Sequence, residues 1–311
     1  MIVVVMSSNV NFEKTFDLSK NKYSWKDDMI IIAGPTCVGK SNIAIELAKK
    51  INGAIINADS VQVYKDLNLI SARPTIDEME AIPHFLYGYI DRNINFSVAD
   101  WLLDTRSALI EVKKLKKIPI LVGGSGLYLN AVINGLSPIP AITQETKNKC
   151  LLKFNQVGIE KFRKINFEID SQFIKNNIDK HRLLRAYSVY VETGKNMSFW
   201  HSQSRDRMID KVIYPFLIYL DRQILYNKCN RRFNEMLSKG ALEEVRLIHN
   251  KIDRSLPIAR SLGVKWLLSY LDNEICFEDA IRLSMRDTRR YVKRQITWFS
   301  HNYIPYKVIN M

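Results

Sequence analysis

The sequence predicts an α/β fold in which a parallel β-sheet has helices on both faces, with a helical subdomain inserted into the chain. Three apolar runs, residues 29–33, 54–58 and 118–122, have the length of buried strands. The first and third runs lead into glycine-rich turns. Strands that alternate with helical segments indicate parallel pairing, because a helix carries the chain back to the start of the next strand.

The first strand and helix can be placed closely. The apolar run begins at Met29, and residues 42–51 then carry Ile43, Leu47 and other apolar side chains at helical spacing. Gly53 is expected to end this helix before the second strand. A further strand candidate, 212–220, comes late in the chain. The sheet is therefore expected to resume there, before a helical C-terminal part.

Changes in sequence texture divide the chain into parts. The first 28 residues are polar and irregular, which predicts a poorly ordered leader. After the break Pro138-Ile139-Pro140, the sequence is helical and rich in charge, without a strong strand pattern. We predict a leader at 1–28, a core domain at 29–136 and 206–311 with a helical C-terminal part, and an inserted helical subdomain at 137–205.

Charge and composition restrict the class of partner. Among 311 residues, 46 are basic and 32 acidic, for a net charge of +14, which favours a polyanion such as nucleic acid or an anionic membrane. No apolar run approaches the ~20 residues of a spanning helix, so no membrane contact and a cytoplasmic protein are expected. The four cysteines lack the spacing of a zinc site or a disulfide framework.

A complete G-x-x-x-x-G-K-[ST] motif follows the first strand and opens the first helix. In such a loop the glycines let the backbone wrap around phosphate oxygens, the helix N-terminus supplies N–H donors, and the lysine adds a cation. The hydroxyl of Ser41 can ligate Mg²⁺. We predict a P-loop NTPase-like core that binds phosphate at Gly34, Pro35, Thr36, Cys37, Val38, Gly39, Lys40 and Ser41.

Polar residues also follow the second and third strands. Asp59 is expected at the carboxyl edge of the sheet, as a metal-water partner or general base, with a helix N-cap as the alternative. The amide of Gln62 can pair with an adenine edge, although a solvated helix face is the commoner position for glutamine. The turn Gly123–Gly126 either contacts phosphate or is a tight structural turn.

Basic residues gather in the insertion and near the C-terminus. The insertion contains His181, Arg182 and Arg185. One helical stripe near the C-terminus consists of Arg282, Arg286, Arg289 and Lys293. We predict that both groups contact RNA phosphates, with solvated helix faces as the alternative. Between them, an arginine within 221–233 is a candidate clamp for a diphosphate, with surface charges as the equal alternative for Arg231 and Arg232.

Taken in order, these motifs resemble the tRNA dimethylallyltransferase family, also called tRNA isopentenyltransferases. The resemblance covers essentially the whole chain after the first 28 residues. The matching blocks are 34–41, 57–65, 83–84, 97–100, 120–128, 182–186, 192–195 and 288–299.

The resemblance implies a reaction and roles within it. The donor would be dimethylallyl diphosphate, and the acceptor N6 of adenosine 37, next to the anticodon, in tRNAs that read U-initial codons. The P-loop would hold the departing diphosphate, with Lys40, Mg²⁺ at Ser41 and Arg232 absorbing its charge. Asp59 would remove the proton from N6. Thr36, in the same loop, is counted among the catalytic residues.

The resemblance also implies the anticodon stem-loop of tRNA as partner. No obligate protein partner is expected, and a monomer is the default expectation, because the sequence is silent on oligomeric state. The residues expected to contact tRNA are Asp59, Ser60, Val61, Gln62, Ser125, Lys147, His181, Arg182, Leu183, Leu184 and Arg185.

Other classes of protein share single features with this chain. A P-loop kinase for a small molecule or nucleotide would need the P-loop and Asp59, but not the basic helices. A transferase that prenylates AMP would need no surface for a polyanion. A non-catalytic RNA-binding module would leave Lys40, Ser41 and Asp59 without a purpose. Incorporation of a labelled prenyl group into tRNA or AMP distinguishes these classes.

Overall fold

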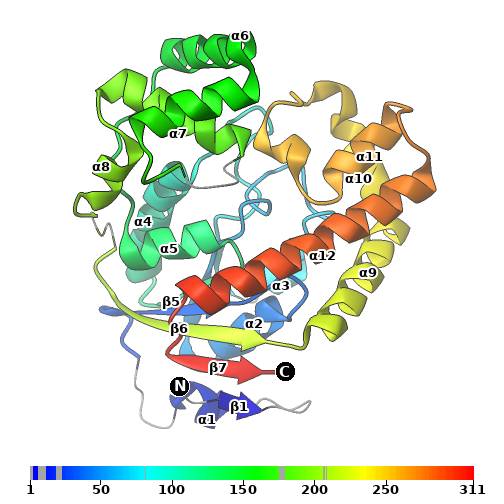
Figure 1. Ribbon diagram of the computed structural model, residues 1–311. Coiled ribbons are helices and arrows are strands. Elements are labelled where there is room, and N and C mark those ends of the chain that lie inside the picture. Colours follow the sequence, from blue (N-terminus) through cyan, green and yellow to red (C-terminus); the bar gives the residue numbers. More distant parts are fainter. Residues whose placement is uncertain are drawn as a thin grey trace. The chain divides into compact units, whose positions relative to one another are not determined.

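A parallel β-sheet is the centre of the structure, a computed structural model that describes residues 3–5, 12–18, 23–80, 82–174, 179–205, 207 and 209–311. Within these residues the sheet has seven strands in the order β1-β7-β6-β2-β5-β3-β4, and all neighbours are parallel (Figure 1). The strands are β1 (Val3–Val5), β2 (Asp28–Ala33), β3 (Gly53–Asn57), β4 (His84–Phe85), β5 (Ile118–Gly123), β6 (Val212–Tyr219) and β7 (Lys307–Asn310).

The helices fall into two compact units of the chain, 1–133 with 208–311, and 134–207. The first unit holds the sheet together with α1 (Phe12–Phe16), α2 (Lys40–Ile51), α3 (Ile76–Glu80), α4 (Val98–Lys114), α5 (Gly126–Asn134), α9 (Arg222–Ser238), α10 (Ala241–Ile248), α11 (Val264–Leu271) and α12 (Phe277–Asn302). Only the last residue of α5, Asn134, belongs to the second unit. Short 3₁₀ helices lie at His249–Lys251 and Pro257–Arg260. The second unit holds α6 (Gln144–Ile169), α7 (Lys180–Thr193) and α8 (Met197–Ser202).

The sheet is buried on both faces at its centre. All residues of β2 and β5 are buried. In β2, Ile30 and Ile32 join the core cluster that contains Leu47 of α2, while Ile31 between them is also fully buried. Because side chains alternate between the faces of a strand, Ile31 must be covered from the opposite face. The predicted α/β fold with a parallel sheet is confirmed.

The inserted unit has a core of its own. Phe162 of α6 packs with Leu183 and Val189 of α7, and all three side chains are fully buried. A kink at Gly158 (φ 75°, ψ 169°) interrupts α6. The predicted inserted subdomain, 137–205, lies inside this unit of residues 134–207.

The carboxyl ends of three strands bring distant loops together. The P-loop follows β2, Asp59 comes after β3, and the glycine turn follows β5, which lies between β2 and β3. Approach is closest at Gly123, where a Cβ would come within 2.1 Å of the Ala58 carbonyl oxygen. Only glycine fits there, which explains part of the turn sequence.

Helix α2, the first helix predicted from the sequence, ends one residue earlier than expected. Asn52, not Gly53, is the C-cap of α2 and has a left-handed backbone (φ 53°), and its N–H donates to the carbonyl of Ala48. Asparagine tolerates this conformation better than most residues with a Cβ. Gly53 instead begins β3, against Ala48 of the helix.

The N-terminal region differs from the poorly ordered leader expected at residues 1–28. Strand β1 pairs in parallel with β7, and Phe16 of α1 is fully buried in the core cluster. The Phe16 ring lies 4.7 Å from that of Phe216 and 5.5 Å from that of Phe12, between ring centroids. Leu18, Tyr23 and Trp25 of the same segment also pack against this cluster. Residues 1–2, 6–11 and 19–22 lie outside the described residues.

No helix among the described residues is both long enough and apolar enough to cross a membrane.

Replacing Phe16 with alanine is expected to lower the free energy of unfolding by about 3–5 kcal/mol, because the change leaves a cavity beside Phe216. The shift in the urea midpoint of the full-length protein measures this loss. Phe167→Ala is the control, since this side chain is 53% exposed and should cost little. An equal midpoint for Phe16→Ala and the wild type would contradict a structural role for α1.

Candidate active site

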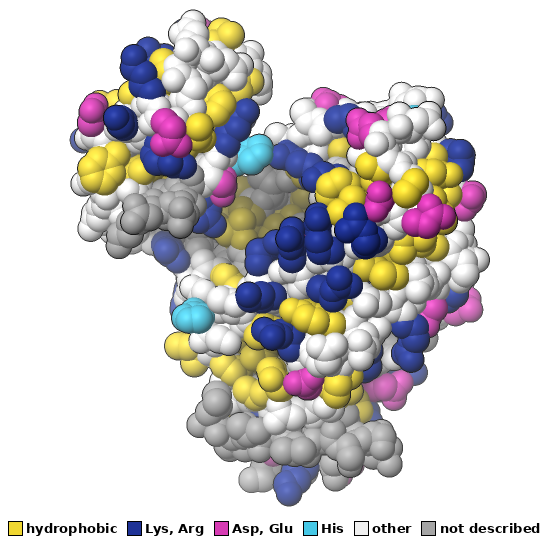
Figure 2. Space-filling model, turned by 45° about the vertical axis from the view of Figure 1, so that its right-hand side comes forward, with side chains coloured by type: hydrophobic (Ala, Val, Ile, Leu, Met, Phe, Trp, Pro, Cys, Tyr) yellow, Lys and Arg dark blue, Asp and Glu magenta, His cyan; other side chains and the backbone are white. Residues whose placement is uncertain are grey.

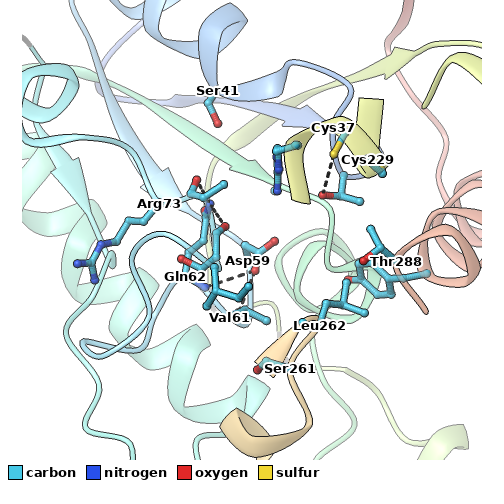
Figure 3. Close-up of a pocket in the computed structure, with 18 of the residues that line it drawn as sticks. Cys37, Ser41, Asp59, Val61, Gln62, Arg73, Cys229, Ser261, Leu262 and Thr288 are labelled. Atoms are coloured by element: carbon cyan, nitrogen blue, oxygen red, sulfur yellow. Dashed lines mark hydrogen bonds between the residues drawn. The ribbon is translucent and has the colours of Figure 1, made fainter. Parts of the chain in front are cut away.

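A cavity of about 670 Å³ lies where the P-loop, the segment after β3, α9 and α12 meet (Figure 3). All of its lining residues belong to the first unit. It brings together ten of the residues predicted from the sequence. These are Thr36, Cys37, Gly39, Lys40, Ser41, Asp59, Ser60, Val61, Gln62 and Arg232.

The P-loop has the backbone expected of an anion site. Gly39 has φ 97°, a left-handed conformation that glycine adopts without strain, and it precedes α2 without a side-chain cap. The Lys40 ammonium donates to the carbonyl of Pro35 at 2.8 Å, which folds the lysine back over the loop. The helix N-terminus and the lysine are therefore available to a negatively charged group.

Lys40 lies in a strongly electrostatic environment. Burial lowers the pKa of its ammonium to about 8, and this is opposed by Asp59 and reinforced by Arg232. Two cations and one carboxylate thus face the same space. An anion bound there would raise the pKa of Lys40 again, because an opposite charge favours the protonated form.

Asp59 is held by its neighbours in a turn. Its Oδ1 accepts the backbone N–H groups of Val61 at 2.9 Å and Gln62 at 3.4 Å. Asn57 is fully buried and bonds to both the N–H and the carbonyl of Asp59. No helix starts at Ser60, so the helix N-cap alternative is wrong, and the carboxylate stabilises a turn instead.

Gln62 also lies in this turn and not on a solvated helix face. Its Nε2 donates to the carbonyls of Ser71 at 3.1 Å and Ala72 at 2.8 Å. The loop that carries these carbonyls is in turn anchored by Glu244, whose carboxylate accepts three consecutive N–H groups, those of residues 68–70. Both amide protons of Gln62 are therefore engaged within the loop, while a contact with adenine stays a prediction.

The glycine turn after β5 is tied to the P-loop by Gln295 of α12. Gln295 is only 5% exposed, accepts the N–H of Thr36 at 2.9 Å and donates to the carbonyl of Gly124 at 2.9 Å. Ser125 is also buried, and its hydroxyl accepts the N–H of Ser60 at 3.3 Å. This geometry favours a tight structural turn at Gly123–Gly126.

Some residues of the cavity were not singled out from the sequence. Tyr128 and Tyr291 line it, and burial together with the nearby Asp59 carboxylate raises the pKa of Tyr291 to about 12. Thr288 and Leu262 also line the cavity (Figure 3). Tyr128, Thr288 and Tyr291 fall inside the blocks 120–128 and 288–299, and these blocks were the available signal.

The insertion residues predicted to contact tRNA lie in different environments. His181 and Arg182 are exposed on α7, and Lys147 is exposed on α6. Leu183 is fully buried in the core of the unit, because helical spacing turns this position inward, and a tRNA contact at Leu183 stays a prediction. A second cavity of about 490 Å³ is lined by Phe173, His181, Arg182, Arg185, Met197 and His201.

The predicted basic stripe is present on α12, and Figure 2 shows Lys and Arg side chains gathered on one face of the molecule. Part of its charge is used internally. Arg282 pairs with Asp279 at 2.7 Å, and Arg286 pairs with Asp287 at 2.9 Å. The Arg282 pair is exposed and therefore weak, whereas Arg286 is half-buried and also lies over the ring of Trp266.

The donors present suit a magnesium ion that shares its ligands with a phosphate. Among the described residues, no group of three or more His, Cys, Asp and Glu side chains could hold a metal ion. Mg²⁺, however, is commonly held by one or two protein oxygens together with substrate phosphates and water. Ser41 and Asp59 both line the cavity and supply such oxygens.

Known proteins resemble this chain over most of its length. A family model described as IPP transferase matches residues 62–302. A tRNA dimethylallyltransferase of Nitrobacter hamburgensis is 40% identical, covering 88% of this chain and 88% of its own. One from Pelagibacter ubique is also 40% identical, covering 87% of each chain.

Solved structures agree with this match. A tRNA isopentenylpyrophosphate transferase from Bacillus halodurans is 29% identical, with a TM-score of 0.66, covering 92% of this chain and 89% of its own. A eukaryotic dimethylallyltransferase acting on tRNA is 26% identical, with a TM-score of 0.77, covering 91% of this chain and 74% of its own. The present chain therefore belongs to the tRNA dimethylallyltransferase family.

Proposed function

We propose that this enzyme transfers the dimethylallyl group of dimethylallyl diphosphate to N6 of adenosine 37, beside the anticodon of tRNAs that read U-initial codons. The observation that carries this proposal is one cavity in which Lys40 and Arg232 face the carboxylate of Asp59. Two cations suit the departing diphosphate, and the carboxylate suits the attacking amine. Because tRNA is the acceptor, we propose the cytoplasm as the site of action.

The P-loop stabilises the leaving group, which is the diphosphate. As the bond between the allylic carbon and oxygen breaks, negative charge grows on the diphosphate, and donors placed beforehand stabilise it. The N-terminus of α2, Lys40 and Arg232 supply such donors, while Thr36 and Ser41 contribute hydroxyls to the same wall. Mg²⁺ held at Ser41 would add positive charge to the diphosphate. The P-loop thereby serves a leaving group and not a transferred phosphate.

The attacking group requires a base. N6 of adenine becomes nucleophilic enough when the new bond to carbon and the loss of its proton proceed together, and Asp59 accepts that proton. Its fixed turn keeps the carboxylate on the cavity wall, and the Tyr128 and Tyr291 side chains lie nearby. The adenine must leave the anticodon stack to reach this position.

The remaining binding energy comes from tRNA phosphates. Exposed basic residues of α7 and α12 suit contacts with the anticodon stem-loop, which offset the cost of extruding the base. A kinase or an AMP prenyltransferase has no use for these helices, and the family match favours prenyl transfer to tRNA.

Incubation of the purified protein with labelled dimethylallyl diphosphate, Mg²⁺ and either unmodified tRNA or AMP tests the proposal. We expect label in tRNA alone, located at adenosine 37 by nuclease digestion and chromatography. Label in AMP, or in neither acceptor, would overturn the proposal. Transfer of phosphate from ATP to a small molecule would support the kinase instead.

Replacing Asp59 with asparagine is expected to slow single-turnover transfer by about 10²-fold or more, because asparagine cannot accept a proton. The amide oxygen can still accept the N–H groups of Val61 and Gln62, so the turn and donor affinity should persist. Rapid-quench transfer and equilibrium donor titration measure the two effects.

The matched control is Asp77→Asn, which changes an exposed carboxylate of α3 outside the cavity and should leave both quantities unchanged. Near-normal transfer by Asp59→Asn would restrict Asp59 to its structural role in the turn.

Replacing Arg182 with alanine is expected to weaken tRNA binding and to reduce the salt dependence by about one released counterion. Folding should be preserved, because the pair with Asp179 is long (3.7 Å) and exposed. Binding isotherms over a salt series give the slope. Arg163→Ala, which breaks an exposed pair on α6 of the same unit, is the control. Equal slopes for Arg182→Ala and the wild type would remove Arg182 from the phosphate contacts.

A further inference from the structure

Two cysteines from distant parts of the sequence meet at the P-loop. Cys37 belongs to the loop itself, and Cys229 lies on α9, one helical turn before Arg232. Their thiol groups are joined by a hydrogen bond, and both residues line the diphosphate cavity. Figure 3 shows the two residues next to each other on one wall. The remaining cysteines, Cys150 and Cys276, lie on α6 and at the start of α12.

The two thiols have different chemical characters. The hydrogen bond from Cys229 lowers the pKa of Cys37 to about 6, with help from the charges of Arg232 and Lys40. The same hydrogen bond, together with burial, raises the pKa of Cys229. These shifts favour a thiolate at Cys37 and a thiol at Cys229 that donates to it. A thiolate beside a thiol is the arrangement of an attacking and a resolving cysteine.

We propose that Cys37 and Cys229 form a modification site. A hydroperoxide oxidises the two thiols to a reversible disulfide, and this disulfide closes the diphosphate cavity. This proposal rests on the function proposed above for the P-loop. The Cys37 thiolate attacks a peroxide oxygen, the O–O bond breaks, and a sulfenic acid and hydroxide form. The Cys229 thiol then attacks the sulfenic sulfur, an S–S bond forms, and water leaves. Two thiols lose two electrons, which reduce one peroxide.

The disulfide closes the site by moving the loop. Bonded sulfurs lie about 2.05 Å apart, much closer than hydrogen-bonded thiols, so the chain at Cys37 must shift toward α9. Cys37 already has a left-handed backbone (φ 63°), and its neighbour Thr36 is held by Gln295. Because both residues are already constrained, the loop cannot absorb this shift locally. The backbone N–H groups that would surround the diphosphate are therefore displaced. In a reducing cytoplasm the bond is transient and restored by thiols.

Bound diphosphate protects the pair. Its negative charge beside Cys37 disfavours the thiolate, and it occupies the space through which a peroxide must enter. Inorganic diphosphate with Mg²⁺ is therefore expected to slow both alkylation and oxidation of Cys37 in the reduced enzyme.

The full-length enzyme is treated with hydrogen peroxide, its free thiols are alkylated, and non-reduced peptides are examined by mass spectrometry. We expect a linked peptide pair containing Cys37 and Cys229. Binding of inorganic diphosphate should be lost with the linkage and recovered after dithiothreitol. Cys276→Ser, at an exposed cysteine, should behave as the wild type.

Cys229→Ser provides the decisive variant. Diphosphate binding by its reduced form is measured first and serves as its own reference. In peroxide it should give no linked peptide and lose that binding irreversibly, because the Cys37 sulfenic acid has no resolving thiol. Cys229→Ala also removes the hydrogen bond that lowers the pKa of Cys37, so its Cys37 should react with peroxide more slowly than in Cys229→Ser. Oxidation of Cys37 without linkage to Cys229 in the wild type, or a linked enzyme that still binds diphosphate, would overturn the proposal. Both readouts are independent of prenyl transfer, so a failure of the proposed function is recognised separately.

Discussion

The geometry of the active site depends on one buried carboxamide. Gln295 accepts the N–H of Thr36 and donates to the carbonyl of Gly124, so one side chain satisfies polar groups of two loops. Leaving either group buried without a partner costs about 1–3 kcal/mol. A glutamate lacks the donor and a leucine lacks both functions. Since Gln295 lies on α12, the helix with the basic stripe is fixed to the P-loop, for which we propose diphosphate binding.

The parts of this site that sequence reasoning located are those with local signals. The P-loop motif and the strand before it lie within one continuous segment, and the end of β3 placed Asp59 at the same edge through the rule for parallel sheets. The helical insertion was visible for the same reason, because a change in periodicity is a property of neighbouring residues. The family resemblance added Arg232, which also lines the cavity.

The parts that escaped prediction depend on contacts between segments far apart in the chain. Nothing near Gln295 indicates that its partners are Thr36 and Gly124, and nothing near Cys229 indicates Cys37. Docking of Phe16 against Phe216 likewise required the folded sheet. Leu183 differs in kind. It lies in a block expected to contact tRNA, but the structure shows that its side chain is buried in the core of the insertion. A family block marks an important segment without separating contact from support.

The same charges serve both the proposed binding of diphosphate and the proposed reactivity of the thiol. Lys40 and Arg232 stabilise any anion in the cavity, whether a departing diphosphate or the Cys37 thiolate. A thiolate at this position of the loop therefore competes with the diphosphate for the same two positive charges. A bound diphosphate would interact with these charges, and its own negative charge would raise the pKa of Cys37 and disfavour the thiolate. In the empty site the thiolate prevails, so susceptibility to oxidation follows the fraction of enzyme without donor.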